Sequence, residues 1–349
     1  MLQTSVRYLI AWSDQDWWER TREAAGVHCA GQWCGCVAAR GPCASSRPQA
    51  AHRRANRVRG ERSRTKARLV AFEQGLQRRG WSSRTNIQID YRFAGGSENL
   101  FESLAKELIA MEPDVILAHT TPAAAAVQRK SSRVPIVFVN VSDPIGAGFI
   151  ASLAKPGGNL TGMLHVEAGI VGKWLAMLKE IAPGVTRAAL LANPKTTAFD
   201  YFLRAAEMVA PASRLELVPS PVATSGDIER VIETLGRIPN SGIILTPDST
   251  TVDHRNRIID LTAHYRVPAA YSFTFFVTAG GLMSYGTDQV DLFRHAANYV
   301  DRILHGDKLA DLPVQEPTRF ETAVNVKTAK ALGLTVPYGL LLAADELID

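Results

Sequence analysis

Cysteine is scarce in this chain and is confined to one place. All four cysteines of the 349 residues lie between Cys29 and Cys43. Their spacing, C-x4-C-x-C-x6-C, matches no common structural zinc site, although a disulfide pair stays an alternative. The chain after Cys43 has no cysteine, which excludes both a disulfide framework and a cysteine nucleophile in that part.

Long apolar runs and catalytic motifs are also absent. No run reaches the ~20 residues of a membrane-spanning helix. There is no P-loop, no G-x-G-x-x-G after a predicted strand and no G-x-S-x-G, and the histidines lack a metal-ligand spacing such as H-E-x-x-H. We therefore expect no catalytic residue, no metal and no cofactor. The alternative is an α/β enzyme with Asp248, Asp253 and His254 as an acid–base set, although the first turn of a solvated helix explains these residues more simply.

Basic residues are concentrated at the start of the chain. Residues 1–66 carry 12 Lys/Arg and 5 Asp/Glu, whereas residues 67–349 carry 27 and 29. The net charge of +5 therefore does not indicate a nucleic-acid partner for the body of the protein. Four of the six tryptophans also lie in the first 66 residues, which differ in composition from everything that follows.

From Lys66 onward the hydrophobic pattern alternates between helix and strand periods. KARLVAFEQGLQRRGW predicts an amphipathic helix with Leu69, Phe72 and Leu76 on one face and Gly80 at its end. NIQIDYRF alternates as a strand does, and the apolar runs DVILAH and IVFVNV predict buried strands. A second series of the same kind begins at WLAMLKEIAP. The pattern predicts an α/β fold with two similar parallel-sheet lobes and a cleft between them.

Small polar residues recur where the predicted strands end. Ligands of open parallel sheets bind beyond the carboxyl ends of the strands, and the free N–H groups of the helices that follow can hold an anion. Any one of these residues is explained as well by helix capping. Because they recur in both lobes, we expect them to line one cleft, together with aromatic residues of YSFTFF as an apolar wall. The expected ligand-binding residues are Thr120, Thr121, Asn140, Ser142, Asp143, Asn193, Asp248, Ser249, Tyr271 and Phe273.

Several longer segments resemble the substrate-binding proteins of ABC transporters, in the subgroup that includes binders of aromatic amino acids. The matching segments include DVILAHTTPAAAA, PAAYSFTFF, GGLMSYGTD and, most specifically, SDPIGAGFIASLAKPGGNLTG. The resemblance covers roughly residues 67–349. It implies the type I periplasmic binding fold, with two lobes joined by three crossovers, and a small ligand that is bound without chemistry.

The resemblance also implies partners and a location. The ligand would pass to a membrane permease driven by a separate ATPase, and the protein would be a periplasmic monomer that binds no nucleic acid. We expect one lobe at residues 67–162 plus 283–315 and the other at residues 163–282 plus 316–349. A ligand-sensing regulator of the same fold is the main alternative, but residues 23–66 lack the apolar period of a helix-turn-helix.

The start of the chain departs from the family, which begins with an export signal and a first strand. We interpret residues from about Arg22 to Thr65 as translated out of frame. A shift of one nucleotide permits RRREFIALGSGVGAWPLAARAQ over residues 23–44, which has the layout of a secretory signal. The same shift permits IGVLIGYAENDPE over residues 52–64, the strand that the family has there. We therefore expect residues 1–66 to be disordered, with the first strand of the first lobe missing.

This interpretation predicts that the chain as written stays in the cytoplasm, because it has no working export signal. Sequencing the gene and searching the native host for peptides from residues 22–66 would test it. Peptides with the present residues, from a gene with an intact frame, would overturn the interpretation.

Overall fold

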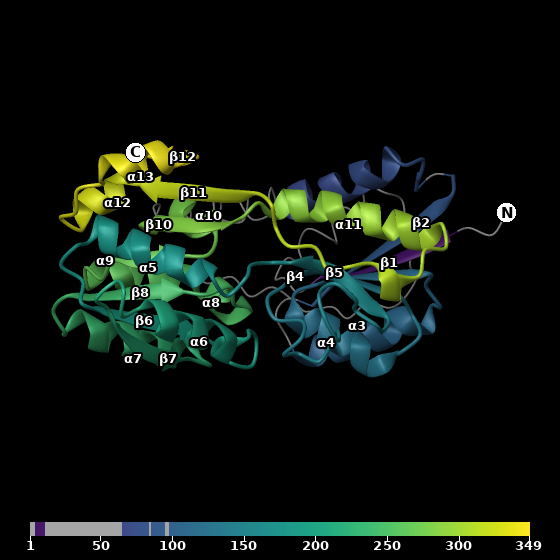
Figure 1. Ribbon diagram of the computed structural model, residues 1–349, viewed down its shortest axis with the longest axis horizontal. Helices are drawn as coiled ribbons and strands as arrows, with labels where there is room; N and C mark the ends of the chain where they lie inside the picture. Colours follow the sequence, from purple (N-terminus) through teal and green to yellow (C-terminus); the bar gives the residue numbers. More distant parts are fainter. Residues whose placement is uncertain (1–3, 11–64, 84, 95–97) are drawn as a thin grey trace, which may run out of the picture.

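Two lobes of α/β architecture lie side by side in the computed structural model (Figure 1). The structure describes residues 4–10, 65–83, 85–94 and 98–349. Each lobe has a central sheet with helices on both faces, as expected for sheets built from parallel strands. The α/β fold with two similar lobes, predicted from the alternating pattern, is confirmed.

The first lobe contains a five-stranded sheet in which every pair of neighbours is parallel. The order is β2-β1-β3-β4-β5. The strands are β1 (Thr4–Ile10), β2 (Ile87–Phe93), β3 (Val115–His119), β4 (Ile136–Val141) and β5 (Leu160–Leu164). Strands β3 and β5 are buried along their whole length, which fits their mostly apolar sequences VILAH and LTGML.

The first strand of this lobe is present, which corrects the expectation that it is missing. Residues Thr4–Ile10 form β1, which pairs with β2 from Thr4 to Ile10 and with β3 from Val6 to Ile10. A central strand is needed here, because the backbone groups of β2 and β3 that face each other would otherwise have no partners. The sequence TSVRYLI is rich in β-branched and aromatic residues, a signal that the sequence analysis missed. The segment that we interpret as translated out of frame, from about Arg22 to Thr65, lies almost wholly in residues 11–64, outside the described residues.

Helices cover both faces of the first sheet. One face packs against a helix over residues 65–77 and against α11 (Gln289–Leu304). The other face packs against α3 (Glu98–Ala110) and α4 (Thr121–Lys130). Gly75 allows the helix over residues 65–77 to approach α11, because a Cβ atom there would lie 2.6 Å from the Cβ of Ala297.

The second lobe contains a seven-stranded sheet of order β12-β11-β10-β9-β8-β6-β7. Its only antiparallel pair is that of β10 and β11 among the described strands. Residues 283–287 are therefore part of the second lobe, not of the first, where the sequence analysis assigned them. The strands are β6 (Arg187–Ala192), β7 (Glu216–Pro221), β8 (Ser241–Leu245), β9 (Ala269–Tyr271), β10 (Met283–Thr287), β11 (Phe320–Asn325) and β12 (Glu346–Ile348).

The helices of the second lobe form two layers. One layer consists of α5 (Ile170–Ile181), α6 (Phe199–Val209), α12 (Val326–Ala331) and α13 (Tyr338–Ala343). The other consists of α7 (Ser225–Gly236), α8 (Ser249–Asp253), α9 (Arg255–His264) and α10 (Thr274–Thr278). A short 3-10 helix, η1 (Leu309–Asp311), belongs to the first lobe. No helix in the described ranges is long and apolar enough to cross a membrane.

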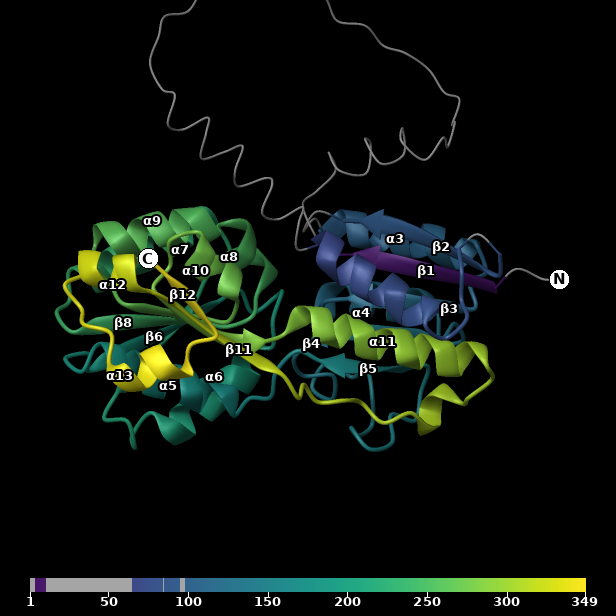
Figure 2. The same cartoon turned by 90° about the horizontal axis from the view of Figure 1, so that it is seen from above.

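Three segments of the described chain run between the lobes: β5 to α5, β10 to α11, and η1 to β11 (Figure 2). Hydrogen bonds join these segments to one another. The N–H of Leu164 donates to the carbonyl oxygen of Gln315 (2.9 Å), and the N–H of Asp288 donates to that of Arg319 (3.0 Å). The hydroxyl of Thr287 donates to the carbonyl oxygen of His165. The three crossovers therefore form one connected hinge.

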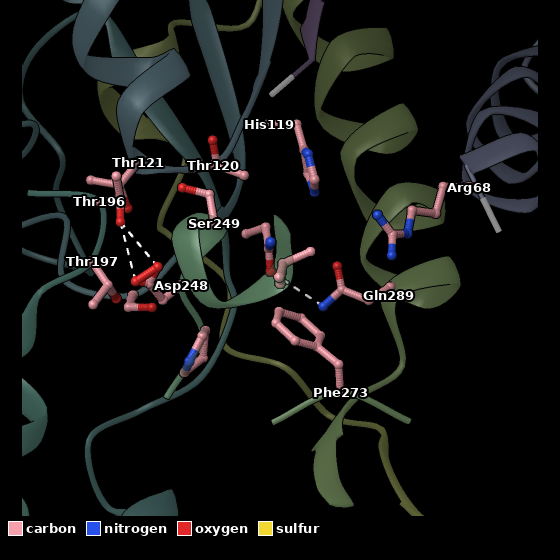
Figure 3. A pocket seen from close by; sticks show the side chains of 14 residues that line it. Arg68, His119, Thr120, Thr121, Thr196, Thr197, Asp248, Ser249, Phe273 and Gln289 are labelled. Carbon is pink, nitrogen blue, oxygen red and sulfur yellow. Dashed lines mark hydrogen bonds between the residues drawn. The ribbon is translucent and has the colours of Figure 1, made fainter. Parts of the chain in front are cut away.

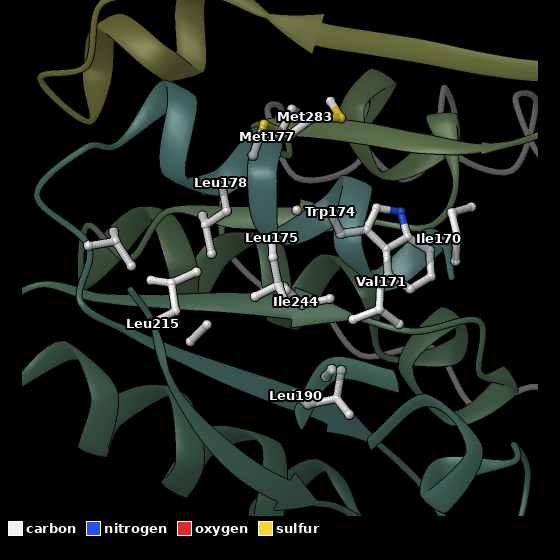
Figure 4. Close-up of a cluster of buried hydrophobic side chains, with 14 of the residues drawn as sticks. Ile170, Val171, Trp174, Leu175, Met177, Leu178, Leu190, Leu215, Ile244 and Met283 are labelled. Atoms are coloured by element: carbon white, nitrogen blue, oxygen red, sulfur yellow. The ribbon is translucent and has the colours of Figure 1, made fainter. Parts of the chain in front are cut away.

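The core of the second lobe is built around Trp174 (Figure 4). Its side chain on α5 is fully buried, and its Nε1–H donates to the carbonyl oxygen of Tyr285 in β10 (2.6 Å). One side chain thus fills the space between helix and sheet and satisfies a backbone acceptor.

We expect Trp174→Ala to lower the free energy of unfolding by about 3–5 kcal/mol, because it leaves a cavity and an unpaired carbonyl. Trp174→Phe should cost less, since most of the ring volume remains. Met208→Ala on the neighbouring helix α6 is the control: its side chain is 77% exposed, so a change within about 0.5 kcal/mol is expected. Urea unfolding measures all three, and equal losses for Trp174→Ala and Met208→Ala would contradict this account of the core.

Candidate functional site

A cavity lies between the two lobes, where the carboxyl ends of their parallel strands face each other (Figure 3). The space between its walls, including the part that is open to solvent, is about 520 Å³. Seven of the ten residues predicted from the sequence line it. The lining residues are Arg68, His119, Thr120, Thr121, Asn140, Ser142, Thr196, Thr197, Pro247, Asp248, Ser249, Val252, Phe273 and Gln289.

The wall of the first lobe centres on the start of helix α4. Thr120 precedes the helix with φ 82°, a conformation that is uncommon for any residue but glycine. No side chain caps this helix end, and the buried hydroxyl of Thr120 has no hydrogen-bond partner among the described residues. Thr121 also lines the cavity. The first N–H groups of a helix lack intrahelical partners, so this end can accept an anion.

Asn140 and Gln289 form a polar bridge between a strand end of the first lobe and the hinge. The amide Nε2 of Gln289 donates to Oδ1 of Asn140 (3.2 Å) and to Nδ1 of His165 (2.9 Å). The other amide atom of Gln289, Oε1, is buried and has no partner in the described part of the chain. Ser142, which follows β4, lines the same wall. This wall therefore offers hydroxyl groups to the cavity, and Gln289 at its edge has a buried acceptor that no described residue uses.

The wall of the second lobe is organised by Asp248. Its carboxylate caps α8 by accepting the N–H of Thr251 (3.1 Å), and it also accepts the N–H of Asn193 (2.7 Å). The hydroxyl of Thr196 donates to the same carboxylate at 3.1 Å. These bonds tie the loops after β6 and β8 together. Burial raises the pKa of Asp248, while the three donors oppose that shift.

Phe273 is the aromatic residue of this wall, and Tyr271 is not part of it. The predicted role of Tyr271 in the site is corrected, because its side chain is fully buried in the core of the second lobe. Its ring stacks on Phe276 with centroids 4.7 Å apart, and its hydroxyl lies 3.3 Å from Oγ1 of Thr262. Burial raises the pKa of Tyr271 to about 12. Phe273 lies two residues further on, beyond the end of β9, where its ring faces the cavity (Figure 3).

Asp143 and Asn193 are also placed away from the cavity itself. Asp143 lies in a neighbouring hollow with Glu167, Tyr201 and Glu316, where its Oδ1 accepts the N–H of Gly146 (2.8 Å). Asn193 is buried behind the wall, and its Nδ2 donates to Oγ1 of Thr250 (2.9 Å). Both side chains support local loop structure, which is the capping role that strand-end Asp and Asn residues often have.

Seven residues of the cavity were not predicted: Arg68, His119, Thr196, Thr197, Pro247, Val252 and Gln289. Five of them lie within a few positions of a predicted site residue. Including a few more residues on either side of each predicted strand end would therefore have found them. Arg68 and Gln289 had no such signal, because each lies in the first turn of a helix that only the tertiary structure brings to the cleft.

The acid–base set considered for an enzyme does not form among the described residues. The carboxylate of Asp248 faces Asn193, Thr196 and Thr251, and no hydrogen bond or ion pair joins it to His254 in the described structure. His254 instead marks the junction between α8 and α9. The cleft therefore contains polar binding groups and an aromatic wall without a paired acid and base.

The sequence of residues 62–348 matches the family model of ABC transporter substrate-binding proteins. The chain belongs to this family. That membership agrees with the resemblance in the loop segments and with a cavity enclosed by two lobes.

One curated relative and several solved structures are similar to this chain. The chain is 26% identical over 265 residues to a tyrosine-binding protein of Clostridioides difficile, which covers 75% of each chain. A crystal structure of an ABC domain from Streptococcus pneumoniae in complex with L-Trp superposes with a TM-score of 0.79 at 20% identity, covering 99% of this chain and 100% of that one. A ligand-free, open substrate-binding protein with adhesive properties from Clostridium difficile gives 0.62 at 24% identity, covering 81% and 94%.

Two histidines beside the cleft, His119 and His165, are buried. Burial, with a smaller effect of the Arg68 charge, lowers the pKa of His165 to about 3 and that of His119 well below its usual value. Both side chains are therefore neutral in the folded protein at pH 7. In the unfolded chain a histidine takes up a proton near pH 6.5.

We therefore predict that stability is fully present above about pH 6.5 and is lost as the pH falls toward 3, because the unfolded state binds the additional protons. Between pH 7 and pH 5, His165 alone should account for about 2 kcal/mol of unfolding free energy. Urea unfolding at these two pH values measures the change. A His165→Gln variant should lose part of the slope, and a wild-type protein with equal stability at both pH values would contradict the prediction.

Proposed function

We propose that this protein is the solute-binding component of an ABC importer and that its ligand is an amino acid or a related carboxylate with an apolar part. The observation that carries the proposal is the uncapped start of α4, which faces the cavity with the unpartnered hydroxyl of Thr120. The tyrosine and tryptophan bound by relatives have the same two features, a carboxylate and an apolar side chain.

The carboxylate of the ligand is assigned to the wall of the first lobe. Partial positive charge at the N-terminus of a helix and the free N–H groups there favour an anion. The hydroxyls of Thr120, Thr121 and Ser142 line the same wall and can each donate a hydrogen bond. No carboxylate side chain of the first lobe lines this cavity within the described residues, so an anion meets no repulsion from that side.

The remaining parts of the ligand are assigned to the second lobe. Phe273, Pro247 and Val252 provide an apolar surface for an aliphatic or aromatic group. Asp248 is the anionic residue of this wall and is the partner for an α-ammonium group. Three protein donors already hold the carboxylate of Asp248 in place, so its side chain need not change orientation when the ligand binds.

Binding from both walls would favour the closed arrangement of the lobes. A ligand that contacts Thr121 in one lobe and Phe273 in the other has its full set of contacts only when the lobes are close together, so it shifts the population toward that state. The hydrogen-bonded hinge can transmit such a motion as a rigid-body rotation. In this role an exported form of the protein acts outside the cytoplasmic membrane as a monomer and delivers its ligand, chemically unchanged, to a permease with its ATPase, without binding nucleic acid.

We expect Thr121→Val to weaken binding of L-tyrosine or L-tryptophan by roughly 5- to 30-fold, the equivalent of one lost hydrogen bond of about 1–2 kcal/mol. Phe273→Ala should weaken it at least as much, because the apolar wall is lost. Isothermal titration calorimetry measures both affinities.

The matched control is Thr234→Val, since Thr234 lies on the exposed side of α7 and donates its hydroxyl to the carbonyl oxygen of Arg230 (2.7 Å). This variant should bind as the wild type does. If no proteinogenic amino acid binds the wild-type protein, the proposed ligand class is wrong. If Thr121→Val and Thr234→Val bind equally well, the carboxylate lies elsewhere.

A further inference from the structure

A second cavity adjoins the ligand cleft, with a space of about 860 Å³ that includes the part open to solvent. Arg68, Phe273 and Gln289 line both spaces, so the two lie side by side with these residues at their border. The far side of the second cavity is formed by the end of β9 and α10, by the β10–α11 crossover, and by β11 and β12. The proposed function makes no use of this space.

The far side of this cavity is acidic. Asp288, Glu321 and Glu346 line it, and they come from the crossover, from β11 and from β12. Partial loss of solvent and the negative charges of Asp288, Asp345 and Glu346 raise the pKa of Glu321. The hydroxyl of Thr274 donates to Glu321 at 3.4 Å. Three carboxylates thus line one hollow, with the side chains of Glu321 and Glu346 exposed to solvent, and a positive charge is favoured beside them.

Neutral acceptor atoms of the same cavity are also unused. Ser272 is 1% exposed, and its Oγ has no hydrogen-bond partner among the described residues. The buried Oε1 of Gln289 likewise has none there. Leaving a buried polar atom without a partner costs about 1–3 kcal/mol, so a bound group with N–H donors would offset this cost.

An aromatic pair completes the lining. The rings of Phe273 and Phe275 are stacked, with centroids 4.8 Å apart and planes 12° from parallel. The face of such a ring attracts an organic cation. Arg68, at the border with the ligand cleft, is the basic residue of the lining, and its charge acts on His165 and on His119, which lines the ligand cleft.

The arrangement suits an organic cation better than a metal ion. No group of three or more His, Cys, Asp or Glu side chains in the described part of the chain has the geometry to hold a metal. Several separated acceptors and an aromatic face instead match an ammonium or guanidinium group, which carries several N–H donors and an apolar stem.

We propose that the second cavity binds an organic cation, with Glu321 as its main ionic partner, the acceptors of Ser272 and Gln289 as hydrogen-bond partners and the Phe273–Phe275 pair as its aromatic wall. The proposal extends the proposed function, because the adjoining position allows one solute to place a carboxylate at α4 and a cationic group beyond Phe273. It does not depend on that function, since the cation site is complete without the carboxylate site.

Agmatine, a guanidinium amine without a carboxylate, is the probe for the cavity alone. We expect saturable binding of agmatine to the full chain in calorimetry, weakened by high salt, and at least a roughly ten-fold loss in Glu321→Gln because one charge-assisted partner is removed. Glu216→Gln is the matched control: Glu216 is an exposed glutamate on β7 that pairs with Arg187 at 2.7 Å, so this variant should bind agmatine as the wild type does. Asp288 is left unchanged, because it caps α11.

L-Arginine and L-citrulline, which have the same length but differ in charge, test whether one solute spans both cavities. We expect arginine to bind more tightly, Glu321→Gln to abolish the difference, and Thr121→Val to weaken arginine but not agmatine. Absence of agmatine binding, or equal loss in Glu321→Gln and Glu216→Gln, overturns the cation site whatever the amino acids do. Agmatine binding without any amino-acid binding supports the cation site and contradicts the proposed function instead.

Discussion

The hydrogen bonds among the three crossovers are the constraint on which the rest of the structure depends. Leu164 with Gln315, Asp288 with Arg319, and Thr287 with His165 join segments that are far apart in the sequence. These bonds hold the three crossovers together as one hinge, on which the carboxyl ends of both sheets face one space. The same hinge also positions Gln289, the first residue of α11, between Asn140 and His165.

The two walls of the cleft differ in how well their polar groups are satisfied. In the second lobe, Asp248 receives donors from Asn193, Thr196 and Thr251, so its position is determined before any ligand arrives. In the first lobe, the hydroxyl of Thr120 has no partner among the described residues, and the helix behind it is uncapped. A preorganised wall opposite a wall with unused donors is an arrangement in which a ligand supplies the missing hydrogen bonds and so favours closure.

Aromatic residues at the end of β9 show how one strand can serve both core and site. Tyr271 is the last residue of the strand and is buried against Phe276, whereas Phe273 lies beyond the strand and lines both cavities. A shift of two residues along the chain thus separates a packing role from a binding role. The acidic cavity beyond Phe273 depends on β11 and β12, which the end of the chain adds to the sheet beside β10.

The sequence by itself determined the fold class and most of the cleft, because strand-end residues such as Thr120, Ser142 and Asp248 are fixed by local periodicity and by the rule that parallel sheets bind at their carboxyl ends. It also carried the segments by which the chain is assigned to the substrate-binding family. Only the tertiary structure decided that Thr4–Ile10 forms an inner strand of the first sheet, because a short segment forms such a strand only where neighbours such as β2 and β3 need its hydrogen bonds. Tertiary packing likewise decided that Tyr271 is buried and that Arg68 and Gln289 reach the cleft. Hydrophobic periodicity reports local helices and strands, and it does not show which distant elements come into contact.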